Sequence, residues 1–344
     1  YAESCELGLA RRDDARLAGA LDALYATDAD VPLGDTGRWR SAAESERNEP
    51  PTKLTRADLG WRSLLFAGAS LPPLNRESMP SALLEGQGIA VFRRDRGAGY
   101  AALDYGHHGG GHGHPDRLNV LLAHGLRHLL DDMGTGSYVD PSLHWYRSTL
   151  AHNAPLVNGK SQPRASGTLL AYDERDDLGW VCASARVSEQ PPVIARRALT
   201  VMSSVVVDDL RWSSDALVRM ELPIHARVRV GGSAAWSPTT LEGGDGLEDG
   251  FSFVHDARHA HVAAGEVVRL VDEASSATIA WVTSSEAAEW FTALAPGAPG
   301  EGEQQFLLVR VRAKAGAIRS VWDPTLTLKE VVASDSGLAL TRLE

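Results

Sequence analysis

Leu103–Gln162, LDYGHHGGGHGHPDRLNVLLAHGLRHLLDDMGTGSYVDPSLHWYRSTLAHNAPLVNGKSQ, is the stretch around which the rest of the 344-residue chain is organised. It holds eight of the twelve histidines, at positions 107, 108, 112, 114, 124, 128, 144 and 152. Glycines and acidic residues are interleaved with them, and regular apolar patterning resumes on both sides. A hydrophobic core has no need of imidazoles gathered in one segment, so we expect the chemistry of the protein here.

The chain around this stretch has the pattern of an antiparallel β structure from about residue 82 to its end. Short β-branched or alternating runs are punctuated by Gly, Pro, Asp and Ser, as is typical of a sandwich or barrel. They include GIAVFRRD, YAALDYG, LNVLLAH, WVCASARV, RALTVMSSVVV, IHARVRV, FSFVHD, TIAWVTS, QFLLVRVRAK and LTLKEVV. The sequence therefore predicts a mainly β fold, with residues 82–344 forming a large antiparallel β-sandwich.

Residues 1–75 are expected to be helical. Leucines recur at helix-compatible intervals, and Asp13 and Asp14 stand where an N-cap belongs ahead of ARLAGALDALY. Thr55 and Asp58 form a second start signal, and the polar segment between the two helices, rich in Pro and Gly, is typical of a loop. These helices are few and short for an independent α domain, so we interpret them as the last part of a larger helical region.

Composition excludes several classes of protein. The net charge of −11 argues against a general nucleic-acid-binding protein, although a local basic cleft for an anionic substrate stays compatible with it. The two cysteines, Cys5 and Cys182, form neither a metal motif nor a disulfide framework. No run approaches the roughly 18 apolar residues that a membrane-spanning helix needs, and the abrupt start at Tyr1 resembles a mature or truncated chain.

The spacing of the histidines and aspartates predicts a metal site. His112, His114 and Asp116 alternate, so an extended segment would place them on one face. A hairpin that turns near 124–125 would place the strand partner of residue 116 close to 132–133, and so bring Asp132 back beside that segment. Imidazoles and a carboxylate at one strand end suit a divalent ion such as zinc, with His152 as the best-placed further imidazole. Spacing alone leaves open which of the two adjacent aspartates faces inward.

Three other sites fit the sequence less well. No helix pattern follows the glycine loop 106–113, which argues against a dinucleotide site. A GxSxG nucleophile elbow is absent and neither cysteine has a histidine nearby, which argues against a covalent hydrolase. A cupin-like metalloenzyme needs a glutamate shortly after its HxH motif, whereas Pro115 and Asp116 follow here and no Glu occurs between residues 86 and 173.

The order of motifs along this stretch resembles that of a known family. DYG, HHGGGHGHPDRL, DDMGTGSY, WYRSTLAHN and VNGKSQ are similar, in sequence and in order, to the C-terminal β region of heparinase II/III-type polysaccharide lyases. These enzymes join an α/α toroid to an antiparallel β-sandwich and cleave acidic polysaccharides by β-elimination. The helices-then-strands layout of the chain agrees with that architecture, which implies that residues 1–75 are the end of an upstream toroid.

The resemblance implies roles for individual residues. His114, Asp132 and His152 correspond to the family's metal ligands, usually for zinc, although another divalent ion such as calcium is compatible. His112 corresponds to the family's active-site histidine on this domain, and the metal would be structural. The catalytic tyrosine of the family comes from the toroid upstream, and neither Tyr1 nor Tyr25 has a matching context. This chain alone is therefore expected to carry half an active site.

Arg147, Arg117 and Tyr146 are the further candidates for substrate contact. The arginines would face a carboxylate or sulfate, and Tyr146 with its neighbour Trp145 could stack on a sugar ring. The predicted function is β-elimination on a uronic-acid-containing polymer or oligosaccharide, outside the cell or in the periplasm, with a cytoplasmic place open for an oligosaccharide-degrading enzyme. The alternative function is a non-catalytic, metal-stabilised β module that binds carbohydrate.

Overall fold

The structure is a computed structural model that describes residues 2–12, 17–18, 80–107, 109–125, 127–232, 235–334 and 337–343. The chain divides into two compact units, 1–79 and 80–344, and each is described by itself. In the first unit, α1 (Ala2–Arg12) is helical as predicted. The predicted helix starts at Asp13–Asp14 and at Thr55–Asp58 lie outside the described residues.

The second unit begins with a small antiparallel sheet of five sequential strands. They are β1 (Ala82–Leu84), β2 (Ile89–Arg94), β3 (Gly99–Asp104), β4 (Asn119–His124) and β5 (Arg127–Leu130). Side chains alternate along β2, where Ala90, Phe92 and Arg94 point inward and the intervening residues are less buried. The β4–β5 hairpin turns where the sequence predicts, because His124 pairs with Arg127.

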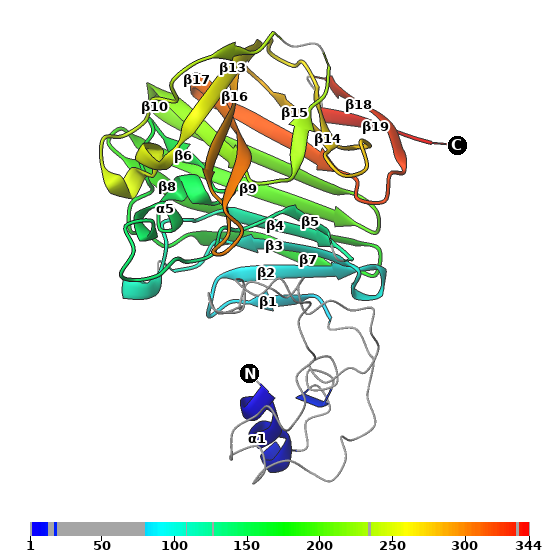
Figure 1. Ribbon diagram of the computed structural model, residues 1–344. Coiled ribbons are helices and arrows are strands. Elements are labelled where there is room, and N and C mark those ends of the chain that lie inside the picture. Colours follow the sequence, from blue (N-terminus) through cyan, green and yellow to red (C-terminus); the bar gives the residue numbers. More distant parts are fainter. Residues whose placement is uncertain are drawn as a thin grey trace. The chain divides into compact units, whose positions relative to one another are not determined.

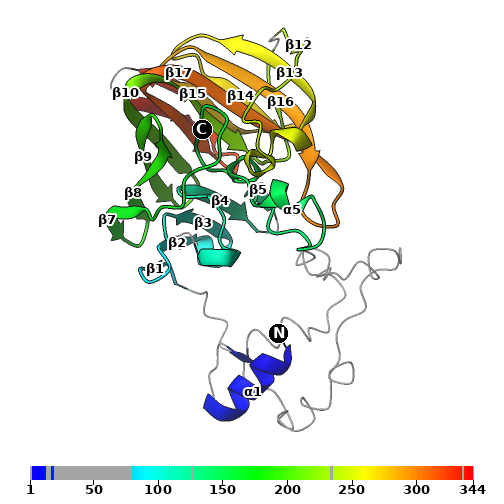
Figure 2. The ribbon, with the colours of Figure 1, turned by 90° about the vertical axis from the view of Figure 1, so that its left-hand side faces the viewer.

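A larger antiparallel sheet of twelve strands follows (Figures 1 and 2). Its strands are β6 (Leu156–Val157), β7 (Thr168–Glu174), β8 (Leu178–Glu189), β9 (Pro192–Met202), β10 (Val206–Ile224), β11 (Val228–Val230), β12 (Ser237–Pro238), β13 (His255–Val262), β14 (Val268–Asp272), β15 (Thr278–Ser284), β16 (Ala288–Pro296) and β17 (Glu303–Trp322). The hairpin β18 (Leu328–Ser334) and β19 (Gly337–Arg342) forms a separate two-stranded sheet.

The long strands β10 and β17 hold the large sheet together. They pair with each other along their length, interrupted by an irregularity between Ser213 and Val218. One half of β17 pairs with β15 and the other half with β16, so the sheet branches there. The second unit is thus mainly β, built from large antiparallel sheets, as the strand pattern predicts.

The two sheets share one hydrophobic core. Phe92, Leu103 and Val120 of the small sheet belong to the same buried cluster as Val181 and Leu199 of the large sheet. The small sheet therefore packs on the face of β8–β10, which gives the sandwich (Figure 1). Its loops, and those that follow β5, carry the histidine-rich stretch.

Candidate metal centre and active site

Two long connections bring the histidine-rich motifs together. One joins β3 to β4 and contains the short 3-10 turn Gly110–His112, and the other runs from β5 to β6 through α5 (Leu143–Tyr146) and the 3-10 turn Thr149–Ala151. Gln162, which follows β6, joins the two connections. Its side chain accepts the backbone N–H of Arg117 and donates to the Arg117 carbonyl, each at 2.9 Å, and it also donates to the Pro155 carbonyl at 2.7 Å.

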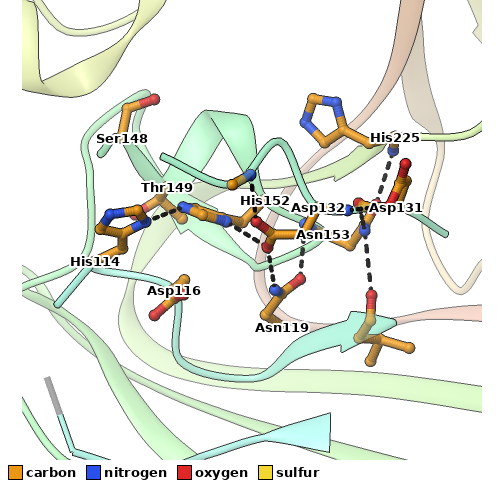
Figure 3. A network of polar contacts seen from close by, with 12 residues as sticks. His114, Asp116, Asn119, Asp131, Asp132, Ser148, Thr149, His152, Asn153 and His225 are labelled. Atoms are coloured by element: carbon orange, nitrogen blue, oxygen red, sulfur yellow. Dashed lines mark hydrogen bonds and ion pairs between the residues drawn. The ribbon is translucent and has the colours of Figure 1, made fainter. Parts of the chain in front are cut away.

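His114, His152 and Asp132 form a continuous chain of polar contacts (Figure 3). His114 Nδ1 lies 3.3 Å from His152 Nε2, and His152 Nδ1 lies 2.7 Å from Asp132 Oδ2. The His152 side chain is almost completely buried. Of the two adjacent aspartates, Asp132 is the one that faces His152, whereas Asp131 Oδ1 accepts the Asp132 backbone N–H. The structure thus answers the question that spacing leaves open.

Burial and charge shift the pKa values of these groups in opposite directions. Burial lowers the pKa of His114 to about 4, with the adjacent His152 acting in the same direction. Burial also disfavours a charged His152, but Asp132 outweighs it and raises the pKa of His152 to about 9. Burial would raise the pKa of Asp132, yet His152 and hydrogen bonds from Gly134 and Asn119 hold it below its ordinary value. Asp132 is therefore a carboxylate.

The donor atoms of these residues, imidazole nitrogens and carboxylate oxygens, are of the kinds that bind zinc. Two nitrogens that are each bound to a tetrahedral zinc at 2.0–2.1 Å lie about 3.3 Å apart, which is the separation of the two facing imidazole nitrogens, 3.3 Å. Asp116 completes a group with His114 and His152 whose ligand atoms lie within 4.8 Å of one another. Asp132 meets the other nitrogen of His152, where a carboxylate commonly orients a metal-binding histidine. In this structure Asp116 thus lies with the two imidazoles, whereas Asp132 lies at the ring nitrogen of His152 that does not face His114.

Asn119 and Asn153 tie the His152 segment to the β4–β5 hairpin. Asn119 Nδ2 donates to Asp132 Oδ2 at 2.8 Å, and its Oδ1 accepts the backbone N–H of Asn153 at 3.0 Å. Asn153 Nδ2 donates to the carbonyls of Val120 and Asp131. Both amides are buried. Asn153, in the AHN motif, therefore fixes the position of His152 relative to the β4–β5 hairpin.

A buried arginine reaches the same segments from the large sheet. Arg197 on β9 pairs with Asp208 on β10 through two N–H···O bonds of 2.8 and 2.7 Å. Its remaining Nη1 donates to the carbonyls of Leu118 and Asn153. These carbonyls belong to the connection that carries His114 and to the one that carries His152, so one guanidinium joins both.

A second group of side chains lies at the surface of the same connections. His112 Nδ1 is 2.7 Å from the Tyr138 hydroxyl, and the Arg147 guanidinium lies 5.9 Å from the centre of the Tyr138 ring. Arg147 also donates to the carbonyl of Gly111. Tyr138 is 58% exposed. An imidazole, a phenol and a guanidinium that all reach solvent can exchange protons with a bound molecule and neutralise its negative charge.

The other two predicted substrate contacts lie inside the protein. Tyr146 is 7% exposed and donates its hydroxyl to the Gly297 carbonyl, and Trp145 is fully buried with its indole N–H on the Pro296 carbonyl. Arg117 is 3% exposed and binds the carbonyls of Gly106 and His114 and the carboxylate of Asp116. These side chains support the loops from inside the protein.

The sequence reasoning missed three functional candidates. Tyr138 lies inside the quoted GTGSY motif and follows a glycine turn, a signal that could have marked it as exposed. Arg197 occupies an inward position in the alternating row of β9, and Asp208 does the same on β10. A charged residue in an apolar period-two row is a readable sign of a buried ion pair.

Comparisons with known proteins show which solved folds this chain resembles and to which family it belongs. No curated protein sequence matches the chain. Among solved structures, "Heparinase III-BT4657 gene product" is 12% identical with a TM-score of 0.54, over 82% of this chain and 43% of that one. "Crystal Structure of Heparinase III" is 15% identical with a TM-score of 0.54, over 80% and 43%.

A heparan sulfate lyase HepC from Pedobacter heparinus is 11% identical with a TM-score of 0.52, over 95% of this chain and 52% of that one. At such identities these likenesses concern the fold alone, and the chain spans about half the length of those proteins or less. The family model "Heparinase II/III-like, C-terminal" matches residues 76–319. This chain belongs to the heparinase II/III-like C-terminal domain family.

Proposed function

We propose that this chain is the β-domain part of a polysaccharide lyase that cleaves a uronic-acid-containing acidic polysaccharide by β-elimination. The observation that carries the proposal is the exposed group of His112, Tyr138 and Arg147, in which the imidazole and the phenol share a 2.7 Å contact. Membership of the heparinase II/III-like family supports the reaction class. The alternative, a carbohydrate-binding module, has no need of such a group.

The three side chains suit the three requirements of the elimination. The Arg147 guanidinium would neutralise the uronate carboxylate, which makes the C5 proton more acidic. A base then takes that proton, the electron pair forms the C4–C5 double bond, and the bond from C4 to the glycosidic oxygen breaks. The departing oxygen takes a proton from an acid. Tyr138 and His112 provide one proton-exchanging pair, and the second tyrosine is proposed to come from an upstream α/α toroid.

A zinc ion is proposed as a structural cofactor, held by His114, Asp132 and His152. Asp116 is the other carboxylate within reach, and variants decide between the two. When bound, zinc would supply fixed coordination bonds that lock the two connections to each other. Because His112 lies two residues before His114, this lock would fix the position of the imidazole that faces the substrate.

The proposal includes the cellular location of the protein and the identity of its polymer substrate. A polymer too large to enter a cell favours a periplasmic or extracellular enzyme. Heparan-type glycosaminoglycans and alginate both carry uronates and are the first substrates to assay. Among the described residues, no helix has the length and apolar character needed to cross a bilayer.

The test is a substrate screen on the full-length polypeptide, read by the ultraviolet absorbance of the unsaturated uronate that elimination creates. His112→Ala is expected to abolish turnover. His107→Ala is the matched control, because His107 is also an exposed histidine of the same connection, with its Nδ1 on the Ser166 hydroxyl at 2.8 Å. Polymer binding without an unsaturated product would reject the lyase and favour the binding module.

A further inference from the structure

The solvent-facing side of β8–β10 carries an unusual set of side chains, which we call the arginine face: Trp180, Arg186, Arg196, Asp209, Arg211 and Arg319 of β17. Strand register places them side by side, because Ser184, Arg196 and Arg211 pair across three adjacent strands. In the next row Asp209 pairs with Arg319. Alternate residues of these strands are buried in the core, so all six side chains point to one side of the sheet.

The charge on this face opposes that of the protein. Four arginines stand there with three carboxylates: Asp209, Asp173 of β7 opposite Trp180, and Glu189, whose carboxylate lies 3.8 Å from Arg186. The face therefore carries a small positive charge, although the chain as a whole has a net charge of −11. Arg196 and Arg211 lie directly opposite each other, an arrangement of like charges that destabilises a sheet. Asp209 binds Arg211 at 2.7 Å and approaches Arg319 at 3.5 Å. No described carboxylate pairs with Arg196, so an anion from outside would relieve the repulsion.

The face also offers an apolar platform. Trp180 is 38% exposed near the start of β8. The positions between it and the arginines hold small serine, cysteine, alanine and threonine side chains. A sheet surface with small side chains is flat enough for an extended chain to lie on it. An indole can stack on a sugar ring, and guanidinium groups match carboxylates and sulfates through paired N–H donors.

We propose that the arginine face binds a second stretch of an anionic polysaccharide, at a distance from the reacting bond. This inference rests on the proposed function for the identity of the polymer. Arg197 and Asp208, which alternate with the face residues on the same strands, point the other way and contact the connections of the metal centre. The face and the His112 group therefore lie on opposite sides of the large sheet. One long polymer would have to wrap around the domain, or two polymers would bind.

The experiment measures binding of the full-length protein to immobilised heparin and to alginate, with uncharged dextran as the blank. Arg196→Glu/Arg211→Glu is expected to weaken heparin binding about tenfold, a loss of roughly 1.4 kcal/mol. Trp180→Ala is expected to weaken it less, and high salt should remove most of the difference. The control Arg229→Glu, on the exposed side of β11, changes the net charge in the same way per residue but should leave binding nearly unchanged.

Binding and turnover are measured separately, so that the two proposals can fail independently. Arginine-dependent heparin binding without any cleavage product would reject the lyase function and retain the binding face. Cleavage with unchanged polymer binding in Arg196→Glu/Arg211→Glu would overturn the binding face and retain the lyase. A change in sedimentation of that variant, with polymer binding intact, would show a contact between copies of the chain and would also overturn it. Arg196→Gln repeats the test if the double variant fails to fold.

Discussion

Replacing Arg197 by methionine tests whether one buried ion pair holds the two connections of the metal centre together. Arg197 and Asp208 have side-chain exposures of 2% and 3%. The variant would leave Asp208 charged and buried, and among the described residues its remaining hydrogen-bond partner is the Ser320 hydroxyl at 3.4 Å. Removing one partner of a buried pair costs about 3–5 kcal/mol, and we expect Arg197→Met to lower the free energy of unfolding by that amount.

The double variant Arg197→Met/Asp208→Leu separates the charge from the loop contacts. It leaves no orphaned carboxylate, so the remaining cost is that of the Leu118 and Asn153 carbonyls, which lose their shared donor. An unsatisfied buried acceptor costs about 1–3 kcal/mol. We therefore expect the double variant to be more stable than Arg197→Met, although still less stable than the wild type.

Arg94→Met is the matched control. Arg94 binds Glu174 in the same two-bond manner, at 2.6 and 2.9 Å, but the Glu174 side chain is 28% exposed. Water can hydrate the released carboxylate, so we expect a loss nearer 1 kcal/mol, as for partly exposed pairs. The comparison holds the chemistry constant and changes the burial.

Urea denaturation followed by tryptophan fluorescence gives the free energies, provided that the slope of the transition is unchanged between variants. Amide hydrogen exchange at Asn119 and Asn153 then reports the local effect, and it should accelerate in both Arg197 variants but not in Arg94→Met. Equal losses for Arg197→Met and Arg94→Met, or a double variant no more stable than the single one, would refute this reasoning.

Three further predictions concern the site itself. His114→Ala should abolish bound zinc in elemental analysis. Asp132→Asn should also abolish it if Asp132 is a ligand, but should lower the zinc affinity only about 10–100-fold if Asp132 orients His152. An unchanged zinc affinity in Asp132→Asn would reject both roles. Tyr138→Phe should lower kcat by a factor of about 10²–10⁴ without changing the melting temperature, because the ring is 58% exposed; kcat within twofold of wild type would exclude proton transfer by Tyr138. Burial lowers the pKa of His225 from the ordinary value of about 6.5 to about 4. On acidification the unfolded chain therefore binds a proton at this residue before the folded chain does. Between about pH 6.5 and 4 this difference lowers the free energy of unfolding by about 3 kcal/mol. His225→Gln should flatten that part of the stability profile in urea titrations, and an unaltered profile would contradict the assignment.

The sequence predicts best those features that depend on local residue patterns and on the order of motifs along the chain. The period-two runs predict the strands, and the hairpin from β4 to β5 follows from the turn expected near 124–125. That hairpin alone was enough to bring Asp132 near the strand start at Asn119. The motif order added the family, because several spaced motifs in one order are far more specific than any single one.

The features that the sequence does not predict depend on contacts between segments distant in sequence. The stretch around His112 was expected to be extended, but a 3-10 turn forms at Gly110–His112, where Gly109 and Gly110 adopt positive φ angles. Tyr146 is an aromatic residue of a type that can stack on a sugar ring, yet its hydroxyl donates to the Gly297 carbonyl, 151 positions away in sequence. No local pattern reports such a partner, so burial of an aromatic residue cannot be told from exposure there.

The shared long strands have a consequence for synthesis on the ribosome. β10 ends at Ile224 and its partner β17 begins at Glu303, so one edge of β10 waits for a segment made much later. At about 5–20 residues per second, translation of the intervening residues takes roughly 4–16 s. During that interval the nascent sheet offers an open edge to neighbouring chains. The exposed arginines and aspartates along β10 would then act as gatekeepers against aggregation before the molecule is complete.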